Sequence, residues 1–310
     1  MKICILGAGS LGSAIGGALA LVGNEVHFVG RKAHMDAIRK HGLVMVTGGE
    51  ERTAHPVPHE TPDGIGKCDL VIVLCKAFDT QRTIETGADL IGPDTVVTTF
   101  QNGLGAEGIL SSAIGAEHVI GGKTYIGGML LEPGRVKASF AQKETFVGEL
   151  DGAESARVDR IAAAFNRAGM ETSATTNILG VIWDKLLVNV STGAVCAITG
   201  LPYGGLYSQE SLLEVSRAAV REGIAVAHAA GVKLTYEDPD KVLWMAGKGL
   251  PASFKPSLQQ SLESGRRTEV DVIAGAVVRE GRRLGVPTPV NHTLWACVKG
   301  IERCHEEYGD

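Results

Sequence analysis

Residues 2–23, KICILGAGSLGSAIGGALALVG, join an apolar segment to a small-residue segment through glycines at the spacing GxGxxG. Ile3, Ile5 and Leu6 predict a buried strand, and residues 10–22 predict a helix. A strand, turn and helix of this kind place the pyrophosphate of a dinucleotide at the amino end of the helix. The pattern therefore predicts a dinucleotide-binding domain, and its flanking elements argue against a merely flexible glycine-rich terminus.

The glycines of this turn have separate roles. Gly7 permits the tight bend, Gly9 leaves bare backbone beside the pyrophosphate, and Gly12 lets the helix lie close to the strand. We therefore expect the cofactor to contact Gly7, Gly9, Ser10, Leu11 and Gly12.

The residues after the second predicted strand, Glu25 to Val29, indicate which dinucleotide is bound. NAD-binding domains usually carry an acidic residue here, which accepts hydrogen bonds from the ribose 2′-hydroxyl. This chain instead has Arg31, with Lys32 and His34 nearby. A guanidinium matches a phosphate dianion, so we predict that Arg31 binds the 2′-phosphate of NADP(H). The alternative is that these are ordinary solvated charges at a helix start, which the helix dipole disfavours.

The composition limits the fold classes and the partners that this chain can have. The 310 residues are 44% hydrophobic and 21% charged. This fits a globular α/β protein of two domains, because a single core rarely grows beyond about 250–300 residues. The net charge of −5 creates no field that would attract nucleic acid or an anionic membrane. We expect a small-molecule substrate, no nucleic-acid or membrane partner, and a monomer or homodimer.

The cysteines and the apolar runs indicate the compartment. Six cysteines occur without a CxxC pair, and Cys4 and Cys75 lie in apolar segments where a free thiol acts as a small hydrophobic group. This usage is typical of a reducing compartment. Met1 and Lys2 lead directly into a strand, and no uninterrupted run of about 18 apolar residues is present. We predict a cytoplasmic protein with no metal site.

Strands and helices alternate through the first half of the chain, as a doubly wound parallel sheet requires. We expect strands at 69–75 and 95–100, a hairpin at 43–55, a helix at 80–90 and short β segments over 118–148. After Thr176 we expect only helices, at 177–190, 211–230, 256–264, 269–284 and 293–307. The predicted fold is an α/β protein with a Rossmann-type domain over residues 1–176 and an all-helical domain over residues 177–310.

Polar residues at two strand ends and on one helix are candidates for chemistry. Lys185 and Asn189 are four residues apart, so they share one face of an otherwise apolar helix. Buried polar groups need partners, which a substrate would supply. The alternative is a lysine whose ammonium reaches water and an asparagine bonded to backbone. Lys76 and Asn102 follow predicted strands, at the end of a parallel sheet that faces the ligand.

Ser257 and Glu269 stand twelve residues apart, across a predicted helix and a turn. Taken alone, Glu269 is an ordinary acidic residue in the first turn of a helix, where Thr268 and Asp271 form a capping box. The pair indicates a site only together with the other polar residues.

These motifs resemble the ketopantoate reductase family in their order along nearly the whole chain: GAGSLG at Gly7, then Arg31, LCKAFDT, QNG, WDKLLVNV and the pair Ser257 and Glu269. The resemblance implies a Rossmann domain, a helical C-terminal domain and NADPH-dependent reduction of a 2-oxo acid. The substrate it implies is 2-dehydropantoate (ketopantoate), reduced to pantoate in pantothenate biosynthesis. It also implies that Lys76 and Asn102 line the cleft for cofactor and substrate.

The resemblance assigns roles to four residues of the second domain. Lys185 matches the general acid of the family, and Glu269 matches the residue that binds the substrate hydroxyl and helps to hold the lysine. Asn189 and Ser257 match substrate-binding residues. The chemistry agrees, because hydride delivery to a ketone leaves negative charge on oxygen, which a cationic donor stabilises and protonates.

Two positions depart from the family pattern. Gly193 stands where better-known members have an asparagine, and Ser261 stands where an aspartate is usual. A lost amide removes a hydrogen bond worth about 0.5–1.5 kcal/mol. One alternative is therefore a reductase of another branched or bulky 2-oxo acid. Another is a regulator that binds NADP(H) without turnover.

Overall fold

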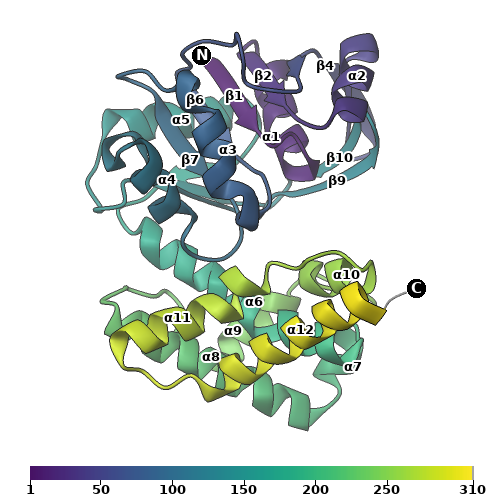
Figure 1. The fold of residues 1–310 in the computed structure, drawn as a ribbon, viewed down its shortest axis with the longest axis vertical. Coiled ribbons are helices and arrows are strands. Elements are labelled where there is room, and N and C mark those ends of the chain that lie inside the picture. The colour runs from purple at the N-terminus through teal and green to yellow at the C-terminus, as the bar shows by residue number, and fades with distance from the viewer. Residues whose placement is uncertain (309–310) are drawn as a thin grey trace. The chain divides into compact units, whose positions relative to one another are not determined.

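The computed structural model describes residues 1–308, which divide into two compact units (Figure 1). The first unit comprises Met1–Gln101 and Ala106–Ile178. The second comprises Asn102–Gly105 and the chain from Leu179 onward. The short segment Asn102–Gly105 therefore packs with residues that come much later in the chain.

A five-stranded parallel sheet forms the centre of the first unit. Its strands, in spatial order, are β5 (Val57–His59), β2 (Glu25–Val29), β1 (Lys2–Leu6), β6 (Leu70–Val73) and β7 (Val96–Thr99). Every residue of β6 and β7 is buried, which is typical of strands covered on both faces. The chain crosses over on both sides of β1, which confirms the predicted doubly wound sheet.

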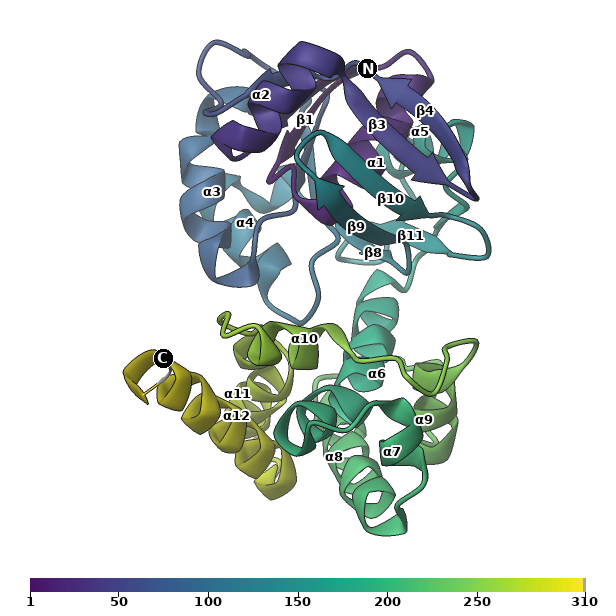
Figure 2. The same cartoon turned by 90° about the vertical axis from the view of Figure 1, so that its right-hand side faces the viewer.

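Five helices and two small sheets complete the first unit. The helices are α1 (Ser10–Leu21), α2 (Lys32–His41), α3 (Thr80–Thr86), α4 (Ala106–Ile114) and α5 (Ala156–Arg167). One small sheet contains β4 (Glu50–Ala54), β3 (Leu43–Thr47), β10 (Arg135–Ser139) and β9 (Gly127–Glu132). The other contains β12 (Thr172–Ala174), β11 (Thr145–Gly148) and β8 (Gly121–Thr124). Strand β9 lies against α1, as can be followed in Figure 2.

The second unit is helical, which confirms the predicted helical C-terminal part. Its helices are α6 (Ile178–Thr199), α7 (Tyr203–Tyr207), α8 (Glu210–Ala229), α9 (Pro239–Gly247), α10 (Ser257–Glu263), α11 (Ala274–Leu284) and α12 (Pro289–Tyr308). A 3-10 turn, η4 (Val270–Val272), precedes α11. The sequence did not predict the short helices α7 and α9.

Helix α6 is the apolar core helix of this unit. By length and composition it could cross a membrane, but 72% of its most apolar 18-residue stretch is buried inside the protein. Such burial is typical of the core helix of a globular domain, which packs against other helices on most of its sides.

The two largest errors in the predicted helix boundaries are the end of α6 and the start of α11. Helix α6 continues to Thr199 instead of ending at Val190, and the hydroxyl groups just after Val190 have partners inside the unit. The hydroxyl of Ser191 donates to the carbonyl of Val188 at 2.8 Å, and the hydroxyl of Thr192 lies 3.1 Å from that of Tyr203.

The second wrong boundary is the helix expected to start at Glu269. Helix α11 starts at Ala274, and Glu269 instead precedes the 3-10 turn η4. The expected capping box does not form. The N–H of Thr268 donates to Glu302 Oε1 at 2.6 Å, and Asp271 accepts a hydrogen bond from Trp295 Nε1 at 2.8 Å. Long-range partners therefore replace the local ones.

His34 is a structural residue of the first unit and not a phosphate ligand, which corrects the expectation that it lies near the 2′-phosphate. Its side chain is 5% exposed. Nδ1 accepts a hydrogen bond from the N–H of Gly134 at 2.9 Å. The neutral ring then carries its proton on Nε2, which lies 2.9 Å from the hydroxyl of Ser13. Burial lowers the pKa of His34, because a second ring proton would be desolvated and would break the bond to Gly134.

Acid should destabilise the first unit through His34. Its pKa in the folded protein lies below its ordinary value of 6.5, so the unfolded chain binds more protons in this range. The free energy of unfolding should therefore fall as the pH drops through about 6.5 and below. Urea unfolding at about pH 7.5 and about pH 5.5 should show a smaller loss for His34→Gln, whose amide keeps a donor and an acceptor.

His41→Gln is the matched control, because His41 lies on the same helix and is exposed. This variant should lose as much stability in acid as the unmodified protein. An equal loss in His34→Gln would contradict the assignment.

Candidate functional site

The glycine-rich turn between β1 and α1 has the geometry that a pyrophosphate needs. Gly7 has a φ of +101°, and a Cβ there would lie 2.5 Å from the backbone nitrogen of Cys75. A Cβ on Gly12 would lie 2.4 Å from the carbonyl oxygen of Gly7. At Gly9, by contrast, a Cβ would meet no atom within 4 Å. Two glycines are therefore required by the fold, and the third leaves open space.

The first turn of α1 offers backbone donors to an anion. Ser10, Leu11 and Gly12 start the helix, which has no acidic residue in its first turn and no side-chain cap. The first N–H groups of a helix have no partner inside it, and they carry the positive end of its dipole. The Ser10 hydroxyl is used inside the fold, where it accepts a hydrogen bond from the N–H of Leu130 at 3.2 Å. The backbone of this turn thus suits phosphate oxygens.

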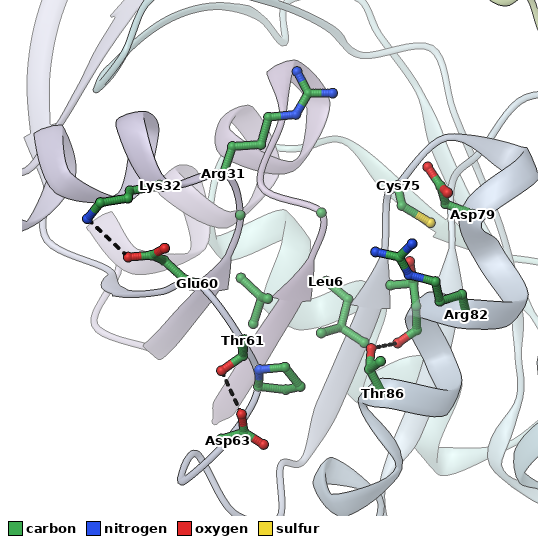
Figure 3. Close-up of a pocket in the computed structure, with 15 residues that line it drawn as sticks. Leu6, Arg31, Lys32, Glu60, Thr61, Asp63, Cys75, Asp79, Arg82 and Thr86 are labelled. Atoms are coloured by element: carbon green, nitrogen blue, oxygen red, sulfur yellow. Dashed lines mark hydrogen bonds and ion pairs between the residues drawn. The ribbon is translucent and has the colours of Figure 1, made fainter.

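A pocket of about 680 Å³ opens beside the turn in the first unit (Figure 3). It is lined by the carboxyl ends of β1 and β2, by residues 60–63 and by the segment from Cys75 to Thr86. In Figure 3, Arg31, Lys32 and Glu60 lie on one side of Leu6. The structure therefore brings the predicted residues Gly7 and Arg31 to one pocket, with segments that the sequence did not mark.

Arg31 and Lys32 both line the pocket, but they differ in their ion-pair partners. The ammonium of Lys32 is held by the carboxylates of Asp36 at 3.0 Å and Glu60 at 3.4 Å. Arg31 is exposed and caps the start of α2. It makes no ion pair with any residue between 1 and 308. Of the two cations, Arg31 is the better ligand for an added phosphate.

The ends of β6 and β7 are tied together by Gln101. Its Nε2 donates to the carbonyl of Cys75 at 2.6 Å, and its own carbonyl accepts from Lys123 Nζ at 2.5 Å. Lys123 is only 1% exposed. These bonds fix the residues just before the predicted site residues Lys76 and Asn102. No sequence pattern pointed to Lys123, because the pattern of its short β segment does not reveal which side chains point inward.

Residues 102–105 form a turn that packs on η4. The N–H of Leu104 donates to the carbonyl of Val272 at 3.0 Å. Gly103 has a φ of +87°, and a Cβ there would lie 2.3 Å from the same oxygen. Glu269 is the residue that precedes η4. The turn that carries Asn102 is therefore packed against the turn that Glu269 begins.

Lys185, Asn189 and Gly193 follow one another at helical spacing on α6. Lys185 and Asn189 are half-buried. Within the described chain, Nδ2 of Asn189 is buried and has no hydrogen-bond acceptor, at a typical cost of about 1–3 kcal/mol. We call the face of α6 that carries Lys185, Asn189 and Gly193 the polar stripe. A Cβ on Gly193 would lie 3.8 Å from Leu258, so the polar stripe continues toward α10, which begins with the exposed Ser257.

Asp184 anchors α6 inside its own unit. Its side chain is 4% exposed, and its two oxygens accept from the N–H of Thr235 at 3.1 and 3.2 Å. Burial raises the pKa of Asp184, and these bonds oppose the rise. Adjacent residues on a helix do not share a face. Asp184 therefore fixes the helix on one side while Lys185 lies on another.

No second chemical centre is evident among the described residues. All six cysteines are free. In residues 1–308, no group of three His, Cys, Asp or Glu side chains is placed to hold a metal ion. The candidate site consists of the phosphate-binding turn and pocket of the first unit, and of the polar stripe and turns of the second.

Two family models match this chain. The model described as ketopantoate reductase PanE/ApbA matches residues 3–152. The model described as the C-terminal part of ketopantoate reductase PanE/ApbA matches residues 177–302. A curated relative, the 2-dehydropantoate 2-reductase of Halobacterium salinarum, is 35% identical over 306 residues, which cover 98% of this chain and 99% of the relative.

Solved structures of the same fold include enzymes with different substrates. A PanE/ApbA family ketopantoate reductase from Ralstonia eutropha is 31% identical, with a TM-score of 0.91 over 99% of this chain and all of the other. A D-mandelate dehydrogenase, solved with NADH and anilino(oxo)acetate, is 28% identical with a TM-score of 0.90 over 99% of this chain and all of the other. The fold thus carries more than one 2-oxo acid specificity.

Substitutions in the glycine-rich turn should separate binding from folding. Gly12→Ala should lower the thermal midpoint, because its Cβ would lie 2.4 Å from the Gly7 carbonyl. Gly9→Ala should leave the midpoint almost unchanged, since its Cβ would meet no atom within 4 Å. The same methyl should weaken NADPH binding about tenfold or more, because it occupies the space for the pyrophosphate.

Scanning fluorimetry and titration with NADPH would measure the two effects. Gly108→Ala is the control, since its Cβ would also meet open space and Gly108 is not a lining residue of the pocket. It should change neither NADPH affinity nor the fold. NADPH binding of unmodified strength by Gly9→Ala would refute the role of this turn.

Proposed function

This chain belongs to the ketopantoate reductase family of oxidoreductases, and from this premise we propose that it reduces 2-dehydropantoate to pantoate with NADPH. The observation that carries the proposal is on α6. There Asn189 presents a buried amide that has no acceptor among residues 1–308, four residues after Lys185. An unpaired buried donor beside a lysine is the arrangement expected of a site for an anionic carbonyl substrate.

The first unit fits a nicotinamide adenine dinucleotide. The backbone at Gly9 leaves room for a pyrophosphate, and the start of α1 supplies donors for it. We take NADP(H) as the cofactor because Arg31 carries a guanidinium without an ion pair among residues 1–308, where NAD-binding domains have a carboxylate. D-mandelate dehydrogenase, by comparison, was solved with NADH.

The reduction needs one hydride and one proton. When bound, the nicotinamide supplies the hydride, which forms the new C–H bond at the carbonyl carbon. The carbonyl π electrons move to oxygen, and the cationic side chain of Lys185 stabilises this charge and donates the proton that completes the hydroxyl. Asn189 and Ser257 donate hydrogen bonds to the substrate carboxylate. Glu269 accepts from the 4-hydroxyl and helps to hold the lysine.

A second candidate function is the reduction of a bulkier 2-oxo acid by the same chemistry. Gly193 supports it, because this position on the polar stripe of α6 has no side chain and a Cβ there would only just touch Leu258. The bound anilino(oxo)acetate of the similar D-mandelate dehydrogenase is a compound of that kind. Ser261, which lacks the charge of the usual aspartate, is also compatible with a less polar substrate.

We place the reaction in the cytoplasm, as a step of pantothenate biosynthesis. All six cysteines are free, which suits a reducing compartment. A monomer or a homodimer is compatible with this function.

Removing the proton donor should abolish turnover and spare cofactor binding. Lys185→Ala should lower kcat by about two to four orders of magnitude, the usual contribution of a general acid. The Kd for NADPH should change little, because the phosphate-binding turn and Arg31 are untouched. Lys248→Ala is the control, since Lys248 is an exposed lysine of the same unit. A Lys185→Ala enzyme with unchanged kcat would disprove the mechanism.

A substrate and cofactor panel tests the specificity. Oxidation of NADPH and of NADH should be followed with ketopantoate, 2-oxoisovalerate and phenylglyoxylate. We expect the highest kcat/KM for ketopantoate with NADPH, by about tenfold or more over either alternative acid. A preference for phenylglyoxylate would support the second candidate function instead. Tight NADPH binding without turnover of any acid would favour the regulator.

A further inference from the structure

The pocket of the first unit contains a second arginine with no assigned role. Arg82 lies on α3 and lines the pocket. Figure 3 shows it on the other side of Leu6 from Arg31. We propose that Arg82 forms the base-binding wall of the cofactor site by stacking its guanidinium on the adenine ring. Because NADPH and NADH share this ring, Arg82 would contribute equally to the affinity for each cofactor. This inference rests on the proposed function in taking an adenine dinucleotide as the ligand.

The order of elements around the pocket places the base near α3. In a doubly wound sheet the pyrophosphate lies at the start of the helix after β1, and the ribose lies at the end of β2. Gly7 and Arg31 mark these two places here. The pocket continues past Leu6 to Cys75 and α3. The adenine is bonded to this ribose, so it is the part of the ligand that would lie in the continuation of the pocket toward α3.

Residues at helical spacing present one face of α3 to the pocket. Asp79 precedes the helix, Arg82 and Thr83 follow three and four residues later, and Thr86 lies one turn beyond them. These spacings put the four side chains on one face. The face is part of the pocket wall, so Arg82 is directed to the space that a ligand would occupy.

The guanidinium of Arg82 is exposed. Within residues 1–308 it makes no ion pair, whereas Arg157 of the same unit is bound to Glu149 at 2.6 Å. Arg82 therefore has its planar face available. Stacking on an aromatic base uses that face and requires no charge on the ligand.

The charges of the two walls indicate that Arg82 takes the base and Arg31 takes the phosphate. Asp79 stands on the wall of Arg82 and makes no ion pair within the described residues, so its charge opposes a phosphate dianion there. On the wall of Arg31, the charge of Glu60 is met by Lys32 at 3.4 Å. An added phosphate is therefore better placed beside Arg31.

The experiment compares Arg82→Ala with Arg31→Ala in the full-length protein. The Kd of NADPH and the Kd of NADH are measured by titration of the protein's fluorescence. For Arg82→Ala we expect both values to rise by the same factor, about tenfold, because the planar guanidinium that stacks on the adenine is lost. For Arg31→Ala we expect the rise for NADPH alone. Arg82→Lys keeps the charge but loses the plane, so it should resemble Arg82→Ala.

Arg160→Ala is the control, since Arg160 is an exposed arginine of the same unit and is not a lining residue of the pocket. It should leave both affinities unchanged. An Arg82→Ala effect confined to NADPH, or full rescue by Arg82→Lys, would assign Arg82 to the phosphate and overturn the inference. Unchanged affinities in Arg82→Ala would overturn it too.

The result also distinguishes this inference from the proposed function. If the unmodified protein binds and oxidises NADPH while Arg82→Ala binds both cofactors normally, only the role of Arg82 fails. If the unmodified protein binds neither dinucleotide, the proposed function fails and the inference fails with it.

Discussion

The close packing of α1 on the parallel sheet is the constraint on which the cofactor site depends. A Cβ on Gly12 would lie 2.4 Å from the Gly7 carbonyl, and one on Gly16 would lie 2.3 Å from the ring of Phe28. The helix can approach this closely only because Gly12 and Gly16 have no side chain at these two contacts. That approach sets the positive end of its dipole at the carboxyl edge of β1, beside the open space at Gly9.

The candidate substrate residues of the second unit are arranged differently: one buried group fixes helix α6, and another buried group has no acceptor in the described part of the chain. Asp184 ties α6 to the backbone of Thr235 at 3.1 Å. Asn189 keeps a buried amide without an acceptor among the described residues. A donor that is already desolvated and held in place loses little entropy on binding, so it favours a ligand that supplies the acceptor. The first unit thus offers a ligand mostly backbone N–H donors, and the second offers side-chain donors.

The sequence pattern predicted the secondary-structure elements well where interactions between near neighbours in the chain determine them. The strand expected at Glu25 to Val29 has those bounds, and its three central residues are buried. A Gly-Asn pair directly before it separates it from the preceding helix. The helix expected to start at Glu269 starts only at Ala274, because Thr268 and Asp271 bond to Glu302 and Trp295 of α12. A capping motif can be recognised from the sequence. A distant side chain that competes for the hydrogen bonds of that motif cannot.

Spacing along the chain was enough to predict the strand, glycine turn and helix of the first unit, the position of Arg31 after the second strand, and the shared face of Lys185 and Asn189, because helix and strand periods are local. Long-range packing, in contrast, buries His34 in the fold, turns Lys123 inward to Gln101 and brings Arg82 to a pocket with Gly7. Burial and partnership depend on contacts between segments far apart in the chain, and no local spacing encodes them.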